Sequence, residues 1–176
     1  QGYQDLLLIA KEGDIVYTTL KGADLGKNLF AEELKNSPFN QAFQKALKRN
    51  CTIADFAPYV WSNNQYMAFV IAPILRLDEV VGAVALRLSV APINAIVQRR
   101  EGMGETGETY LVGQLGDRTS YRSDRVIKWK GQAVVGAEKS GEDINKALAG
   151  QAGIAIKHGS TGKLEMGAYA PLDLPN

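Results

Sequence analysis

The same landmarks occur twice along this chain, in the same order, and this internal repeat constrains the fold more than any other feature. Each half contains a predicted strand–turn–strand hairpin, then a helix with a Lys-Ala-Leu triplet, then an Ala-Pro pair. These landmarks are residues 5–17, Lys45-Ala46-Leu47 and Ala72-Pro73 in the first half, and residues 108–121, Lys146-Ala147-Leu148 and Ala170-Pro171 in the second. The spacing is roughly 100 residues throughout, which predicts two similar units in tandem.

Five strands and one inserted helix are predicted for the first unit. Ser37 is suited to cap the helix and Pro38 to its first turn, ahead of an apolar stripe that includes Phe39 and Phe43. The strands are predicted over residues 5–9, 15–17, 52–56, 66–75 and 80–89. A hairpin, a helix and then three antiparallel strands is the order of a PAS-like sheet. A pocket between the sheet and its covering segment follows from this arrangement.

The predicted fold class is therefore α+β, with two tandem PAS-like modules, each an antiparallel sheet with a helical cover. The first module spans residues 1–100, including a connecting helix over 91–100, and the second spans 101–176. The region after Arg122 is richer in Gly and poorer in apolar residues, so we expect a smaller pocket there. By analogy with the first unit, another strand should follow residues 170–172, so the second sheet is expected to be truncated in this sequence.

Composition excludes several classes of function. Lys and Arg total 20 and Asp and Glu total 19, so a net charge of +1 creates no global field to attract nucleic acid. One cysteine, Cys51, and one histidine, His158, provide neither a disulfide framework nor a zinc site. No apolar run reaches the roughly 18 residues that cross a bilayer. Without an initiator Met or a signal peptide, the sequence is interpreted as a soluble fragment in which any membrane segments are missing.

Catalytic and cofactor motifs have little support. Only His158 could act as a histidine base, and the sequence contains no nucleophile elbow, Walker loop or zincin helix. Residues 102–107 match the pattern GxGxxG, but they follow a predicted helix and precede a strand. No helix N-terminus then faces the loop, so no phosphate site is predicted. We expect no catalytic residues, no cofactor and no metal.

Five segments together resemble the double Cache sensor domains found outside the membrane on chemoreceptors, histidine kinases and nucleotide cyclases. These segments are residues 23–29, 55–59, 69–74, 81–86 and 104–113. The resemblance implies a periplasmic or extracellular part of a cell-membrane receptor, with a small molecule held in the membrane-distal first module. It also implies a possible homodimer formed through a long N-terminal helix that this sequence lacks. The Tyr/Arg/Trp/Tyr signature of amino-acid-binding members is not found.

One group of aromatic residues and a carboxylate is the candidate ligand site. It lies on adjoining predicted strands and their loop, where a PAS-like pocket opens, and aromatic faces there could stack on a ring or cage a cation. The alternative is that these rings pack as ordinary core. The candidate residues are Tyr17, Asp55, Phe56, Tyr59, Trp61, Tyr66 and Phe69.

The expected function is sensing of a small molecule, with the ligand shifting the population of two arrangements of the modules. Two rivals are an interaction module that binds no small ligand and, less favoured, a small enzyme. A basic stretch, Arg118, Arg122, Arg125 and Lys128-Trp129-Lys130, is interpreted as a solvated surface loop rather than a contact with anionic lipid headgroups.

Overall fold

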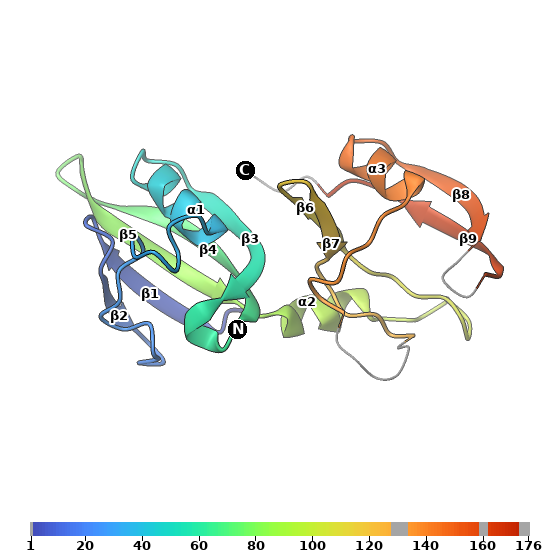
Figure 1. The fold of residues 1–176 in the computed structure, drawn as a ribbon, viewed down its shortest axis with the longest axis horizontal. Helices are drawn as coiled ribbons and strands as arrows, with labels where there is room; N and C mark the ends of the chain where they lie inside the picture. The colour runs from blue at the N-terminus through green and yellow to red at the C-terminus, as the bar shows by residue number, and fades with distance from the viewer. Residues whose placement is uncertain (1, 128–133, 159–161, 173–176) are drawn as a thin grey trace.

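The chain forms two α+β modules connected by a helix (Figure 1). The computed structural model describes residues 2–127, 134–158 and 162–172. Module 1 comprises β1 (Asp5–Ala10), β2 (Ile15–Thr18), α1 (Pro38–Ala46), β3 (Thr52–Tyr59), the short 3-10 helix η1 (Val60–Ser62), β4 (Gln65–Arg76) and β5 (Glu79–Leu88). The connecting helix is α2 (Val90–Val97), and module 2 comprises β6 (Val112–Leu115), β7 (Arg118–Tyr121), α3 (Glu142–Leu148), β8 (Gly153–His158) and β9 (Leu164–Tyr169). The predicted fold class is confirmed, while the boundary at residue 100 stays a prediction.

The sheet of module 1 has the strand order β2-β1-β5-β4-β3, and all neighbouring strands are antiparallel. The last strand, β5, therefore lies at the centre, between two hairpins that precede it in the sequence. It is joined to β4 by Leu77 and Asp78, which have φ values of 47° and 65°. Two central residues with positive φ are typical of the tight hairpin turns whose twist matches that of the strands.

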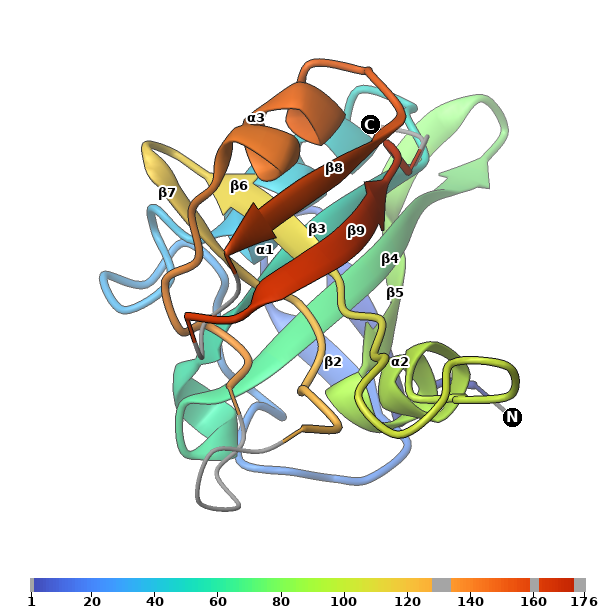
Figure 2. The ribbon, with the colours of Figure 1, turned by 90° about the vertical axis from the view of Figure 1, so that its right-hand side faces the viewer.

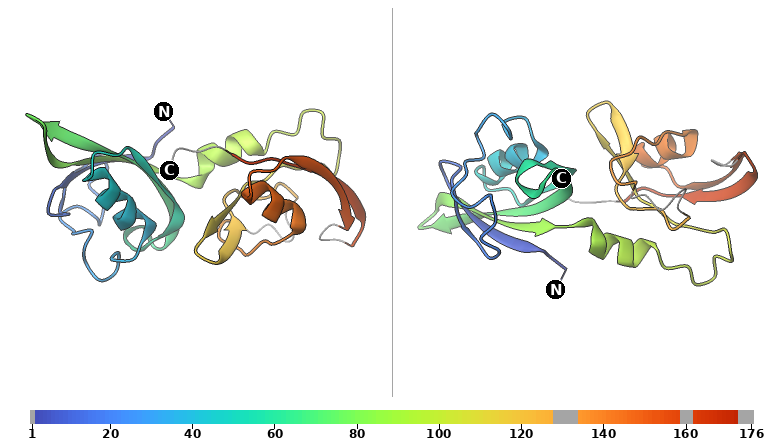
Figure 3. Two further views of the ribbon diagram at one scale, coloured as in Figure 1. Left: turned by 90° about the horizontal axis from the view of Figure 1, so that it is seen from above. Right: turned by 60° about the horizontal axis from the view of Figure 1, so that its bottom comes forward.

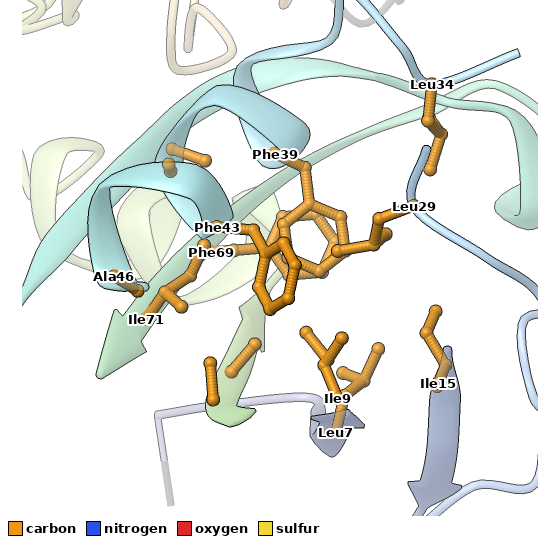
Figure 4. Close-up of a cluster of buried hydrophobic side chains, with 14 of the residues drawn as sticks. Leu7, Ile9, Ile15, Leu29, Leu34, Phe39, Phe43, Ala46, Phe69 and Ile71 are labelled. Carbon is orange, nitrogen blue, oxygen red and sulfur yellow. The ribbon is translucent and has the colours of Figure 1, made fainter. Parts of the chain in front are cut away.

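Helix α1 covers one face of this sheet together with residues 20–37, which we call the cover segment. Ser37 caps the helix by accepting a hydrogen bond from the backbone N of Asn40 at 3.1 Å. Figure 4 shows the rings of Phe39, Phe43 and Phe69 gathered above the side chains of β1. Phe39 and Phe69 are stacked with centroids 3.7 Å apart and planes 2° apart. The apolar stripe predicted from the sequence therefore forms the core of module 1.

The strands of module 2 form two separate hairpins, β6–β7 and β8–β9 (Figure 2). The first hairpin was predicted to begin at residue 108, but β6 begins only at Val112. Among the residues described, the buried apolar side chains of this module are Tyr121 and Ile144. Four large apolar side chains of the second hairpin are 68% to 77% exposed, namely Ile154, Ile156, Leu164 and Met166. Module 2 thus has a much smaller core than module 1.

Helix α2 connects the modules (Figure 3). It is also hydrogen-bonded to module 2. The Asn94 amide donates to a carboxylate oxygen of Asp124 at 2.8 Å and accepts from the backbone N of Asp124 at 2.9 Å. Gln98 donates to the carbonyl oxygen of the same residue at 3.2 Å. The second oxygen of Asp124 accepts from the backbone N of Val134 at 2.8 Å. These bonds fix the orientation of the helix relative to module 2.

Replacing Phe69 with alanine should destabilise the chain by about 3 to 5 kcal/mol, because it removes a fully packed ring and leaves a cavity. The matched control is Val70→Ala on the same strand, where the side chain is 37% exposed and the expected cost is below about 1 kcal/mol. Urea unfolding followed by tryptophan fluorescence measures both. Equal losses of unfolding free energy in the two variants would show that Phe69 stabilises the core no more than a partly exposed residue does.

Candidate functional site

The structure brings together three of the seven predicted ligand residues, all of them aromatic. The Tyr59 ring lies 5.2 Å from that of Phe69 and 5.6 Å from that of Trp61, both edge to face. Phe39 of α1, which was not among the predicted site residues, completes this aromatic cluster at 6.0 Å from Tyr59. The edge-to-face geometry of these three pairs is one that aromatic rings favour when they pack on one another.

The hollow expected between sheet and cover is small in this structure. Asp55, Tyr59, Phe69 and Phe39 line a cavity of only about 10 Å³. A cavity of this size admits about one water molecule. The cavity at these rings is small because Phe39 occupies the space against Phe69. The ligand-binding role of the predicted residues stays a prediction. The alternative interpretation, in which the rings pack as core, describes Phe69 correctly.

Two more predicted residues lie apart from the aromatic cluster. Tyr17 is 45% exposed, whereas its neighbour Thr18 is buried and pairs with Leu7. Successive side chains of a strand point to opposite faces, so an inward Thr18 places Tyr17 on the outer face. Phe56 is buried but does not belong to the core cluster of module 1. Neither Tyr17 nor Phe56 belongs to the aromatic cluster.

Tyr66 and Asp55 lie at the contact between the modules, and Asp55 also lines the small cavity described above. The Arg122 Nε donates to Asp55 Oδ2 at 2.7 Å, and the Arg122 side chain is only 6% exposed. The ring of Tyr66 packs against Gly136, where a Cβ atom would collide with the phenol group. Asp55 lies beside a register irregularity of β3 between Ala54 and Ala57, and such irregularities redirect side chains. The two residues therefore connect β3 and β4 to module 2.

The basic stretch differs from the expected solvated loop. Arg122 is buried and also donates to the Ser120 side chain and carbonyl oxygens at 2.6 and 3.1 Å. Arg125 forms an ion pair with Glu108. Both guanidinium groups thus have carboxylate partners, whereas residues 128–130 lie outside the described part of the chain. The interpretation as a solvated surface loop was wrong for Arg122.

A buried group of charged and polar side chains adjoins the aromatic cluster. Arg87 on β5 donates from Nη2 to Asp5 Oδ2 at 2.9 Å and from Nη1 to Asp24 Oδ2 at 3.0 Å. The Tyr59 hydroxyl donates to the same oxygen of Asp24 at 3.1 Å. Asp5 and Asp24 are fully buried and Arg87 is 5% exposed. These four residues, here called the charge cluster, join β1, β3, β5 and the cover segment.

The two carboxylates of the charge cluster differ in how completely they are satisfied. Asp5 Oδ1 accepts from the Thr19 hydroxyl at 2.5 Å and from the backbone N atoms of Leu6 and Leu20. By contrast, Asp24 Oδ1 and Arg87 Nε have no hydrogen-bond partner among the described residues. Unsatisfied buried polar atoms are costly, and each calls for a physical explanation.

The Tyr59 hydroxyl remains a proton donor. Burial of the ring, with the Asp24 carboxylate adding to the effect, raises the pKa of Tyr59 far above its ordinary value. The arrangement holds two carboxylates and one guanidinium, so it carries one excess negative charge. Such a site suits a group that donates hydrogen bonds or carries a positive charge.

The sequence contained a signal for the charge cluster that the initial interpretation overlooked. Asp5 opens the apolar run Leu6-Leu7-Leu8-Ile9, and Arg87 is the lone charge inside the apolar strand β5 after its first residue. A charged residue at an inward position of an apolar strand requires a partner of opposite charge. Asp24 could not be paired with them from sequence, because its position depends on the path of the cover segment.

Other possible sites are less suited to a ligand. An open hollow of about 420 Å³ lies beside β6, β7 and α3, lined by Gln114, Thr119 and Asn145 among others, none of them buried. In the loop that matches GxGxxG, the carbonyl oxygens of Gly104, Glu105 and Gly107 accept hydrogen bonds from Arg100, so the loop surrounds a cation of its own chain. Among the described residues, no group of three or more metal-ligating side chains occurs.

Solved structures of sensor and receptor domains are similar to this chain. The extracellular ligand-binding receptor from Desulfohalobium retbaense aligns over 89% of this chain and 26% of its own, with a TM-score of 0.55 and 11% identity. The chain has the fold of a Cache-type sensor domain. The V. cholerae histidine kinase DctB sensor domain aligns over 69% of this chain and 61% of its own, with a TM-score of 0.42 and 12% identity. The Campylobacter jejuni chemoreceptor Tlp3 ligand-binding domain, solved with 4-methylisoleucine, aligns over 68% of this chain and 59% of its own, with a TM-score of 0.42 and 10% identity.

The resemblance to Cache sensor domains expected from the sequence is confirmed as a likeness of fold. This chain spans between 26% and 61% of the length of the structures named. No protein-family model and no curated protein matches it. Within the described part of the chain, none of the helices has the length and apolar character needed to cross a membrane.

Removing Arg87 tests the charge cluster. Arg87→Met leaves two buried carboxylates without a cation, which should cost about 3 to 5 kcal/mol of unfolding free energy. Adding Asp24→Asn removes one of those charges, so the double variant should lose about 1 to 3 kcal/mol less than the sum of the single losses. The control is Arg76→Met at the exposed end of β4. If the losses of unfolding free energy in the two single variants simply add in the double variant, as measured by urea unfolding, Arg87 and Asp24 are not energetically coupled.

Replacing Gly136 with alanine tests the contact between the modules. The added methyl group would collide with the Tyr66 phenol, so the modules should separate locally or lose stability. Gly116→Ala is the matched control, because Gly116 also has positive φ but has no atom within 4 Å of the added carbon. Any strain from φ is therefore common to both variants. Hydrogen exchange of the β3 and β4 amides should accelerate only in Gly136→Ala, and equal behaviour would argue against the contact.

Proposed function

We propose that this chain is the ligand-sensing part of a membrane receptor, that it lies on the outer side of the cell membrane, and that it binds a small polar molecule at the charge cluster of module 1. The fold shared with an extracellular ligand-binding receptor supports the class of function. The proposal includes no catalytic step. A small enzyme is disfavoured because His158, the sole histidine, interacts with the Gly162 carbonyl oxygen, far from the charge cluster in sequence.

The observation that carries the proposal is the unsatisfied pair of atoms in the charge cluster. Asp24 Oδ1 is a free acceptor and Arg87 Nε a free donor among the described residues, and both belong to one buried group. Asp24 Oδ1 also lies just beneath the surface. Gly22 is exposed, and a Cβ atom at Gly22 would stand 2.9 Å from this oxygen. A ligand that approaches past Gly22 would therefore meet the free oxygen.

The chemistry of the charge cluster favours a ligand with a hydrogen-bond donor, such as an amine or a hydroxyl group. A charged or neutral donor can pair with Asp24 Oδ1 without breaking the bonds that Asp24 Oδ2 makes to Arg87 and Tyr59. The Trp61 ring, which is partly buried and lies edge to face with Tyr59, is available to contact an apolar part of the ligand. Binding requires the cover segment to shift, since the cavity of about 10 Å³ beneath it is too small for a ligand.

Signalling would follow from the position of β3. This strand carries Tyr59, which belongs to the charge cluster, and Asp55, which pairs with Arg122 of module 2. The ligand would bind better to a state in which the cover segment and Tyr59 are displaced than to the state described here. Such a ligand also biases the Asp55–Arg122 contact, to the extent of its difference in affinity for these two states. The same strand thus couples ligand occupancy to the position of module 2.

A second candidate is an interaction module that binds no small ligand. The filled interior around Phe39 and Phe69 favours it. The two functions differ in the role of Asp24, which is a ligand contact in the first and a purely structural ion-pair partner in the second.

A thermal-shift screen over amines, organic acids, amino acids and purines tests the proposal. A ligand at a hundred times its dissociation constant should stabilise the folded chain by roughly 2.7 kcal/mol. In Gly22→Ala, where the new methyl group crowds Asp24 Oδ1 but every charge remains, the shift should disappear. Asp24→Asn should reduce it as well. Gly167→Ala is the control, since its added carbon meets only Lys157 at an ordinary 3.7 Å.

The comparison within each variant uses the change on adding ligand, so loss of stability alone cannot imitate loss of binding. A shift that persists in both Gly22→Ala and Asp24→Asn would move the site elsewhere. No shift with any compound would favour the interaction module.

A further inference from the structure

Two parts of the cover segment are fixed to module 1 in different ways. The later part, residues 28–37, is held by apolar packing, since Leu29 and Leu34 are 0% and 2% exposed and belong to the core of module 1. The buried Asn40 side chain of α1 also donates to the Leu29 carbonyl oxygen. This part of the cover segment therefore belongs to the core.

The earlier part of the cover segment has no apolar anchor. From residue 19 to residue 27, Asp24 is the only buried residue, and the two large apolar side chains of this stretch, Leu20 and Leu25, are 56% and 41% exposed. A stretch whose one buried side chain is charged buries little apolar surface when it closes. Its position therefore depends on the polar contacts of Asp24 with Arg87 and Tyr59.

Two backbone hydrogen bonds mark the ends of this stretch. The Leu20 backbone N donates to a carboxylate oxygen of the charge cluster at 3.1 Å, and the Gly26 backbone N donates to the Ile15 carbonyl oxygen at 2.9 Å. Residues 21–25, here called the strap, lie between these two anchors. Lys21 and Gly26 have φ values of 49° and 77°. Residues in this sparsely populated region at the ends of a loop are suited to absorb a hinge motion.

We propose that the strap is a latch, which opens as a unit at Lys21 and Gly26 while residues 28–37 stay packed, and that Asp24 keeps it closed. Gly22, past which the ligand would approach, lies inside the strap, so opening uncovers the charge cluster. The role of the latch as an entrance rests on the proposed function. Its opening is a property of the protein without a ligand.

The charge cluster tolerates removal of the strap. Arg87 also pairs with Asp5 at 2.9 Å, so departure of Asp24 leaves one guanidinium balanced by one carboxylate. The Asp24 carboxylate, whose Oδ1 has no hydrogen-bond partner among the described residues, returns to water. Because the desolvation of a buried ion pair offsets much of its Coulomb attraction, this exchange costs little. The strap also donates from the Gly22 backbone N to the Thr18 hydroxyl at 3.3 Å, near the outer limit for a hydrogen bond.

Trypsin measures the opening, because it cleaves after lysine and only in a locally opened segment. Lys21 belongs to the strap, whereas Lys35 is an exposed residue of the packed part. In the whole chain, Asp24→Ala should speed cleavage after Lys21 by about tenfold and leave cleavage after Lys35 unchanged, as followed by mass spectrometry. The matched control is Leu25→Ala, which truncates the neighbouring exposed side chain and should change neither rate.

A second variant keeps every charge of the cluster. In Gly26→Ala the added carbon has no atom within 4 Å, so the substitution acts only through the positive φ of this residue. Opening relieves that strain, so cleavage after Lys21 should rise by about fivefold. Gly150→Ala, where φ is 81° and the added carbon is equally free, is the control outside the strap and should have no effect.

Three results would overturn the latch. Equal acceleration after Lys21 and Lys35 in Asp24→Ala would show that the whole cover segment opens. Equal acceleration in Leu25→Ala would show that apolar packing holds the strap. Unchanged cleavage after Lys21 in Gly26→Ala would remove the hinge, and this variant decides the question if Asp24→Ala does not fold.

The latch and the proposed function fail separately, because these measurements contain no ligand. A compound whose thermal shift disappears in Gly22→Ala would support the ligand site even if the strap does not open as a unit. Conversely, selective cleavage after Lys21 would support the latch even if no compound in the screen binds.

Discussion

Arg87 is the interaction centre on which module 1 depends. It lies on the central strand and reaches Asp5 on β1 and Asp24 on the cover segment, so one side chain connects the sheet to the segment that closes it. Burying three charges is unfavourable unless each finds partners, and here the guanidinium is shared by two carboxylates. The cover segment is thereby held through a polar contact as well as by Leu29 and Leu34 in the core. A contact of this kind is specific in geometry yet sensitive to any competing donor.

This sensitivity links the charge cluster to the rest of the chain. Apolar packing alone would hold the cover segment in a way that a polar ligand could hardly alter, whereas an ion pair with a free carboxylate oxygen can be rearranged by a new partner. Tyr59 and Asp55 lie four residues apart on β3. The Tyr59 hydroxyl is hydrogen-bonded to Asp24 in the charge cluster, and the Asp55 carboxylate is paired with Arg122 of module 2. In the proposed function, a shift of one would reach the other through a single short strand. No long chain of intermediates is needed to connect the charge cluster with module 2.

The repeat and the succession of hairpin, helix and three strands along module 1 were predictable because they depend on local patterns. Ser37 and Pro38 define the start of α1, and alternating apolar residues define the strands. The site was harder to predict, because aromatic residues on strands have the same sequence pattern whether they pack or bind. Phe69 packs against Phe39, a contact between residues 30 positions apart that no local pattern indicates. Likewise, Asp55 and Arg122 meet across the two modules, where the sequence suggested a pocket and a solvated loop.

The difference between the modules follows from what the central strand does. In module 1, β5 supplies Arg87 as well as the buried Ala83 and Ala85, so the strand that joins the hairpins also carries the charge that fixes the cover segment. In module 2, Arg122 at the end of β7 takes the role of a buried cation, and its carboxylate partner comes from module 1. The described part of module 2 is therefore stabilised partly from outside. An element whose buried cation depends on a neighbouring module for its counter-ion responds when that module moves, which is the property that a coupled pair of modules requires.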